Sequence, residues 1–156
     1  MDEIRKIADQ IRLTYIDGFW GGGSIKELFY SFDVIEASSY PIPRAHSVWE
    51  IALHISAWHD IFRNRIINSK TEYHYENDWP HPASPTTQNW SDTLKALNKS
   101  IENLVNSVLN FKEDELYILV PGKSFSFYEM LHGIQQHDQY HAGQVMFLKK
   151  AIQNKQ

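Results

Sequence analysis

The chain has 156 residues, a formal net charge of −4 and no cysteine; 42% of its residues are hydrophobic and 13% are aromatic. This composition is that of a folded globular protein, and the lack of cysteine excludes a disulfide framework, a thiolate metal site and a cysteine nucleophile. Lysine and arginine are scattered along the sequence, which disfavours nucleic-acid binding, and no apolar run approaches the roughly eighteen residues of a membrane span.

The length and the N-terminal charges predict one cytoplasmic domain. A chain of this size can bury a hydrophobic core, and we expect a single domain over residues 1–156. Asp2, Glu3, Arg5 and Lys6 occupy the first turns, where a signal peptide would be apolar.

The first two helices are predicted from spacing and capping. An apolar stripe over about residues 2–15 indicates an amphipathic helix; it consists of Ile4, Ile7, Ala8, Ile11 and Tyr15. Ser24 and Glu27 have the spacing of a capping box, which predicts a short helix that ends before Tyr40, ahead of two prolines. Residues 18–46 are therefore expected to form a long crossover.

The second main helix is predicted from Ser47 to about Asn68. Ser47 and Glu50 form another capping box. The apolar stripe that follows consists of Val48, Ile51, Ala52, Ile55, Trp58, Phe62 and Ile66. His54 lies at the flank of this stripe, so it can face a neighbouring helix.

A long loop and a third main helix come next. Residues 69–86 contain three prolines and are predicted to be a loop, of a length that is usually functional or covers another part of the protein. Residues 85–111 carry an uninterrupted helical stripe: Trp90, Leu94, Leu97, Ile101, Leu104, Val108 and Phe111. This helix offers no chemistry and is predicted to be scaffold.

The last helix, over about residues 126–152, carries histidines on its apolar face. Ser126 and Glu129 form a third capping box. The apolar positions are Phe127, Met130, Ile134, Val145, Leu148 and Ile152, and His137 and His141 complete the series. Because positions four apart share a helix face, we expect both imidazoles to point into the core. Asp138 flanks this seam and is expected to be solvated.

Four main amphipathic helices with long links predict an all-α four-helix bundle, in which metal sites are typically built from facing helices. The only stretch with strand-like alternation is residues 116–120. His54, His137 and His141 supply three nitrogen donors from two of the helices. Three histidines with an open fourth position form the pattern of a catalytic metal site. The alternative is that the rings are core histidines satisfied by hydrogen bonds without a metal.

Two other metal architectures do not fit the sequence. A zincin needs a glutamate directly after the first histidine of the pair, where this chain has Asp138. A ferritin-like di-iron site needs two Glu-x-x-His motifs, and only Glu129 and His132 form one, off the seam.

Two further residues are candidates for orienting a ligand or accepting a proton. Gln144 lies on the histidine face, where it could also be a polar residue at the border of the core, and Glu50 lies one turn before His54. Glu50 has a competing structural role in its capping box. No role is assigned to the remaining histidines, His46, His59, His74, His81 and His132.

Several stretches of the chain resemble the DinB/YfiT-like family of metal-binding helical bundles. They are Gly18-Phe-Trp-Gly21, Pro41-Ile-Pro-Arg-Ala-His-Ser-Val-Trp-Glu-Ile-Ala-Leu-His54, Asp78-Trp-Pro80 and His132-Gly-Ile-Gln-Gln-His137-Asp-Gln-Tyr-His141-Ala-Gly-Gln144. The resemblance implies an up-down-down-up four-helix bundle, a homodimer, and metal ligands at His54, His137 and His141. The family name does not imply DNA binding.

Two classes of function follow from this resemblance and from the residues. The first is an enzyme that uses a divalent transition-metal ion, with zinc or nickel expected, on a small-molecule substrate. It would be a hydrolase or a transferase of a low-molecular-weight thiol, and the two differ in what occupies the open coordination position. The second is a non-catalytic, metal-stabilised bundle that acts in a stress response or as an interaction module.

Overall fold

The computed structural model describes residues 2–18, 23–68 and 78–154. These residues form six α-helices and one short 3-10 helix, and no β-strand occurs within the described ranges. The predicted all-α fold is therefore confirmed. The parts of the predicted loops that fall on residues 19–22 and 69–77 lie outside the described residues.

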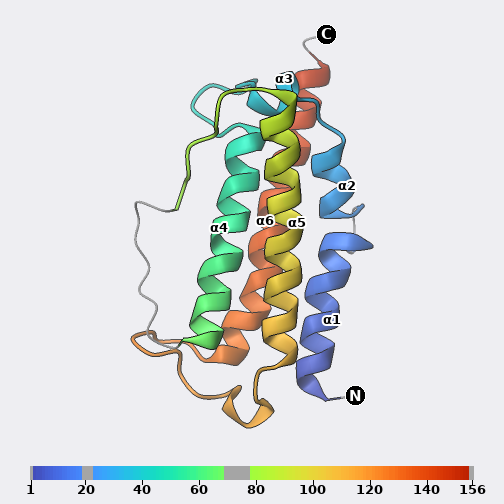
Figure 1. Cartoon of the computed structure of the whole chain (residues 1–156). Helices are drawn as coiled ribbons and strands as arrows, with labels where there is room; N and C mark the ends of the chain where they lie inside the picture. The colour runs from blue at the N-terminus through green and yellow to red at the C-terminus, as the bar shows by residue number, and fades with distance from the viewer. Residues whose placement is uncertain (1, 19–22, 69–77, 155–156) are drawn as a thin grey trace.

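The chain begins with α1 (Glu3–Ile16), which is followed by the short α2 (Ile25–Tyr30). Asp2 caps α1 by accepting a hydrogen bond from the Arg5 N–H at 2.8 Å. Gly18 closes the helix with φ +108°, a conformation that favours glycine, and its N–H donates to the Leu13 carbonyl. Figure 1 shows α1 and α2 following one another toward the same end of the molecule.

The crossover contains one more helix than predicted. Asp33 caps α3 (Val34–Ser38) and forms a full capping box with Glu36. At the predicted box before α2, Ser24 accepts from the Glu27 N–H, but the reciprocal bond of a full box is not formed. The crossover prediction therefore missed α3, because a five-residue helix carries too short an apolar pattern to show a period.

Two long helices, α4 (Val48–Ile67) and α5 (Thr87–Leu109), lie side by side and run in the same direction (Figure 1). Capping fixes their starts: Ser47 and Glu50 form the predicted box, and Thr86 accepts from the Asn89 N–H. The predicted start of α5 near residue 85 is thus two residues early. The six predicted stripe residues that fall in α5 are buried, and Phe111, which follows the end of the helix, is partly buried.

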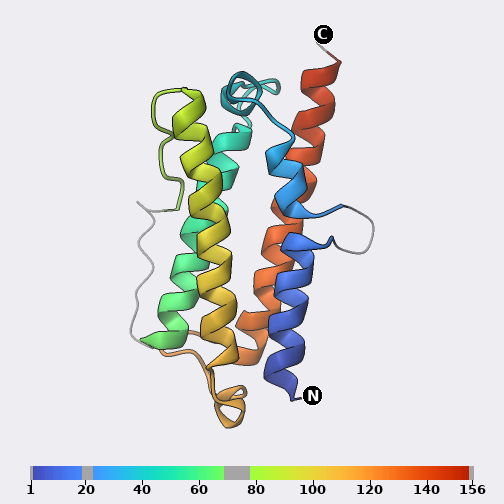
Figure 2. The same ribbon diagram turned by 45° about the vertical axis from the view of Figure 1, so that its right-hand side comes forward.

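The last helix, α6 (Phe127–Gln153), returns against α4 and also contacts α1 and α2. In Figure 2, α6 runs alongside α1 and α2, and the C-terminal end of α6 lies at the other end of the molecule from the N-terminus of the chain. Before it, residues 113–115 form the 3-10 helix η2, and Leu119 and Ser126 form an isolated β-bridge where a strand was considered. No helix of the described part has the length and apolarity needed to cross a membrane.

Candidate metal centre

The three predicted histidines meet between α4 and α6. His54 comes from the first half of α4, and His137 and His141 come from successive turns of α6. One ligand nitrogen from each ring lies within 4.8 Å of the others. The Nε2 atoms of His54 and His137 are 3.2 Å apart. Residues that are 83 positions apart in the sequence are thus brought into direct contact by helix packing.

The other ring nitrogen of each histidine faces a hydrogen-bond acceptor. The Nδ1 of His54 lies 2.6 Å from the backbone carbonyl oxygen of Asp78. The Nδ1 of His141 lies 2.8 Å from Gln144 Oε1, and that of His137 lies 3.2 Å from Asp138 Oδ1. A carbonyl or carboxylate oxygen only accepts, so each Nδ1 carries the proton in this arrangement. Each Nε2 is then left with a lone pair.

This arrangement fits a shared cation. Two Nε2 lone pairs that face each other at 3.2 Å repel unless a positive charge lies between them. In tetrahedral zinc sites the Zn–N distance is about 2.0–2.1 Å, which places two ligand nitrogens about 3.3 Å apart. Nitrogen donors of this kind suit zinc, nickel, copper and iron. The spacing of His54 and His137 therefore fits two ligands of one transition-metal ion, and a nitrogen of His141 lies within 4.8 Å of both.

Burial keeps two of the rings neutral at neutral pH. Removal from water and, to a smaller extent, the neighbouring His137 lower the pKa of His141 to about 4, against the opposing effect of Gln144. Removal from water also lowers the pKa of His54, with the Asp78 carbonyl opposing the shift. A neutral imidazole is the form that binds a metal, so these rings need lose no proton to do so.

Aromatic rings pack against the cluster. Trp79 stacks on His54 with ring centroids 3.9 Å apart, and on its other face it stacks on His46 at 3.5 Å. The ring centroids of Trp58 and Phe62 lie 5.4 and 6.1 Å from that of His137. The described end of the predicted loop, which contributes Asp78 and Trp79, therefore packs directly on the cluster.

The model of the DinB superfamily matches residues 26–145, a range that contains all three histidines. The chain belongs to the DinB superfamily. No curated protein and no solved structure matched it. The family resemblance read from the sequence is thereby confirmed.

Two residues of this DinB superfamily chain were wrongly placed by the sequence analysis. Asp138 was expected to be solvated, but it is 2% exposed and contacts His137. His59 was assigned no role, but it is fully buried, with Nε2 2.9 Å from Asp138 Oδ2 and Nδ1 2.9 Å from Ser100 Oγ. Burial alone would raise the pKa of Asp138, but the two imidazoles outweigh it and hold the pKa at about 2.

A spacing signal for both residues is present in the sequence. Asp138 lies between Ile134 and His141 in an unbroken series of steps of four and three: Ile134, Asp138, His141, Val145, Leu148 and Ile152. The side chain of His137, which was placed in that seam, is instead 19% exposed at its edge. His59 similarly lies on the series of Ala52, Ile55, His59 and Phe62, whereas Trp58 is only partly buried.

Of the two further candidate residues, Gln144 contacts the histidine cluster and Glu50 does not. Gln144 contacts His141, as a residue that orients a ligand would. Glu50 accepts from the Ser47 N–H at 2.7 Å in its capping box and lies 3.5 Å from His46. Glu129, of the discarded di-iron motif, is likewise occupied by Ser126. His74 lies outside the described residues.

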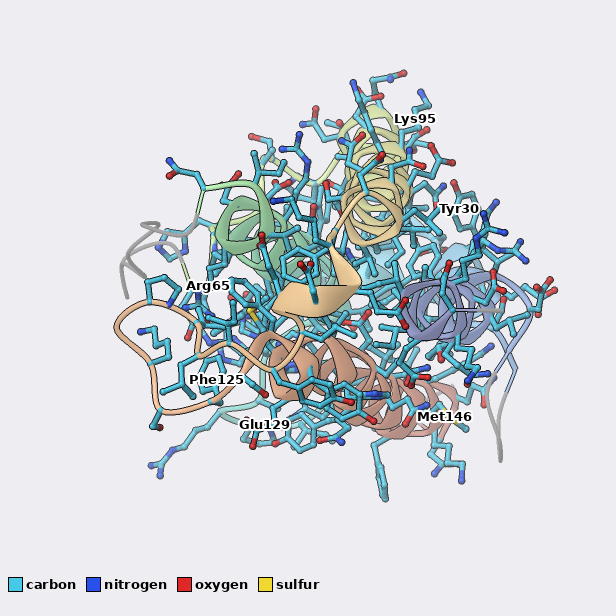
Figure 3. The ribbon with its side chains drawn as sticks, turned by 90° about the horizontal axis from the view of Figure 1, so that it is seen from below. Tyr30, Arg65, Lys95, Phe125, Glu129 and Met146 are labelled. Atoms are coloured by element: carbon cyan, nitrogen blue, oxygen red, sulfur yellow. The ribbon has the colours of Figure 1, made fainter. Side chains whose placement is uncertain are left out.

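Two cavities lie between α4 and α6, on either side of the cluster. The first, of about 540 Å³, is bounded near the cluster by Gln144, and its other polar walls include Arg44, His46 and Tyr140. The second, of about 620 Å³, is bounded by Trp58 and Phe62 and extends to Arg65 and Phe125. Figure 3 shows Arg65, Phe125 and Glu129 on one side of the bundle, near the end of α4 and the start of α6. Cavities of 300–1,000 Å³ are typical of small-molecule sites.

Proposed function

We propose that the protein is a metal-dependent enzyme that acts on a small molecule, with His54, His137 and His141 as ligands of a divalent transition-metal ion. Zinc and nickel are the expected ions. The observation that supports this proposal best is the convergence of the three rings: one nitrogen of each lies within 4.8 Å of the others, the Nε2 atoms of His54 and His137 are 3.2 Å apart, and each Nδ1 is engaged elsewhere.

The surrounding residues support a catalytic more than a structural site. A closed structural site uses four protein ligands, and within the described residues the cluster offers three. A bound ion with an open position lowers the pKa of a coordinated water or thiol, or polarises a substrate. Trp79 shields His54 from solvent, whereas His137 is the most exposed of the three rings. We therefore expect substrate to approach from the His137 side.

The reaction is proposed to be hydrolysis or the transfer of a low-molecular-weight thiol. The two cavities beside the cluster offer space for an organic substrate in either case. Turnover of a substrate panel with and without an added thiol separates the two reactions. Equal turnover without thiol would eliminate the transferase version.

The rival proposal is a non-catalytic bundle that the metal merely stabilises. It draws support from Glu50, the carboxylate considered as a proton acceptor, which is occupied by its capping box. This version predicts that metal removal changes stability but that no substrate is turned over.

We also propose that the protein is a homodimer. Tyr140 and Phe147 lie seven residues apart on α6 and are 65% and 72% exposed, so they form an apolar strip on one helix face. Light scattering on the wild type and on Phe147→Glu tests this. A monomeric wild type would contradict the proposal.

The first experiment on the metal is mass spectrometry of untagged protein purified without chelators, beside His54→Ala. One equivalent of zinc or nickel that is lost in the variant is the expected result. His81→Ala is the matched control, since His81 is exposed. Folded protein that carries no metal and takes up neither zinc nor nickel would overturn the proposed function.

A further inference from the structure

A chain of buried hydrogen bonds runs from the candidate metal centre to α5. The Ser100 hydroxyl donates to the Leu97 carbonyl at 2.9 Å, and its oxygen faces His59 Nδ1. His59 Nε2 contacts one oxygen of Asp138, and the other oxygen of Asp138 contacts His137 Nδ1. The side chains between His137 and the Leu97 carbonyl are all 5% exposed or less.

Serine, histidine and aspartate in contact suggest a nucleophilic triad, but the geometry excludes one here. The proton of Ser100 is directed to a backbone carbonyl, and its oxygen is closed off from solvent. Both oxygens of Asp138 are already engaged. A substrate therefore cannot reach Ser100. The partly exposed member of this series of hydrogen bonds is His137, at the opposite end from Ser100.

The position of Asp138 decides which nitrogen of His137 faces the cluster. An acceptor at Nδ1 keeps the proton there and leaves Nε2 free to bind a metal. Without that acceptor, the ring can rotate or take the other tautomer, which would point an N–H at His54 Nε2. Asp138 cannot swing away, because His59 holds its second oxygen at 2.9 Å.

We infer that Asp138 is a positioning residue for His137, and that His59 and Ser100 hold Asp138 in the orientation this requires. The inference rests on the metal-binding function proposed above. Each oxygen of Asp138 faces one ring nitrogen, so the carboxylate accepts a hydrogen bond at both oxygens.

The test is the zinc affinity of Asp138→Asn and His59→Gln, measured by competition with a chromophoric chelator. In Asp138→Asn, an amide nitrogen replaces one acceptor, so either His137 or His59 loses its partner. We expect zinc affinity to fall about 10- to 100-fold, as is typical when such partners of a metal-bound histidine are changed. Asp60→Asn is the matched control, because Asp60 is exposed on the same helix as His59, and it should bind zinc as the wild type does.

The outcomes separate this inference from the proposed function. A wild type that binds zinc, with a weaker Asp138→Asn and a changed visible spectrum of the cobalt-substituted variant, supports both. Wild-type affinity and spectrum in a folded Asp138→Asn would overturn the positioning role and leave the metal function standing. A wild type without zinc binding would overturn both.

A measurement on the wild type decides the matter if the variants do not fold. The ¹⁵N chemical shifts of the His137 ring in the metal-free protein report its tautomer. A proton on Nδ1 is expected. A proton on Nε2 would contradict the positioning role.

Discussion

The contact between α1 and α5 and the contact between α4 and α6 differ in the kind of side chain that they bury. The buried side of α1 is apolar apart from Thr14 and the hydroxyl of Tyr15, and that hydroxyl bonds Asn98 at 2.8 Å. Between α4 and α6, by contrast, five ionisable side chains lie close together: His54, His59, His137, Asp138 and His141.

The two contacts therefore contribute differently to the stability of the fold. Apolar burial contributes roughly 25 cal/mol per Å², whereas a buried polar group without a partner costs about 1–3 kcal/mol. Every ring of the α4 and α6 cluster therefore needs an acceptor or a cation. The α1 and α5 side has no such need, so the two contacts should respond differently to substitution and to metal.

The largest expected loss of stability is in the apolar scaffold. Leu97 on α5 is fully buried, so Leu97→Ala should lower the free energy of unfolding by about 2–5 kcal/mol through the cavity it leaves. Metal stoichiometry should stay at the wild-type value. Leu109→Ala, at an exposed position of the same helix, is the control and should change stability little. Urea unfolding measures the free energy of unfolding of both variants. A Leu97→Ala variant that folds but binds no metal would show that the metal site depends on the apolar contact.

The next largest expected effect is the stabilisation of the protein by metal bound at the histidine cluster. Zinc at 100 times its dissociation constant should stabilise the wild type by about 2.7 kcal/mol. His137→Ala should abolish this gain, while His132→Ala, on the same helix but packed on Tyr128, should keep it. Thermal unfolding with zinc and with a chelator measures the gain. The same gain in His137→Ala would remove this residue from the ligand set.

The main helices and the meeting of the three histidines could be predicted from the sequence for a physical reason. Apolar periodicity and capping are local properties, and Ser47, Glu50, Ser126 and Glu129 do form two of the three predicted boxes. Asp138 was misplaced because its polarity was weighed above its spacing, although it lies in step with Ile134. Polarity alone does not exclude burial where a partner such as His59 faces the residue.

Other parts of the site could not be predicted from local patterns. The acceptor for His54 is a backbone carbonyl at Asp78, 24 residues away across a loop, and any residue type could supply it. Trp79 stacks between His54 and His46 only because the described end of the loop lies beside the first half of α4. Contacts of this kind depend on the path of the loop, which side-chain chemistry does not fix.

Alkaline pH should act on the scaffold rather than on the histidines. Burial, with a smaller contribution from Tyr30, raises the pKa of the Tyr15 hydroxyl well above its usual 10.0. Above pH 10 the unfolded chain therefore releases this proton while the folded protein keeps it. Stability should fall as pH rises past 10, by at most about 1.4 kcal/mol per pH unit from this group. The fall in the urea midpoint between pH 9 and pH 11 should be smaller in Tyr15→Phe than in the wild type. An equal fall in the two proteins would assign the effect to other groups.

The smallest expected effect decides between the two roles considered for Glu50. Its carboxylate accepts from the Ser47 N–H at 2.7 Å, so Glu50→Ala should cost about 1 kcal/mol of stability through loss of the capping box. Glutamine can make the same bond, so Glu50→Gln should stay within about 0.5 kcal/mol of wild type. Both variants should bind zinc with wild-type affinity, because no described contact joins Glu50 to the three histidines. A Glu50→Gln protein with wild-type stability but reduced turnover or zinc affinity would instead place the charge of Glu50 in the chemistry, and would extend the polar contact of α4 and α6 by one more turn.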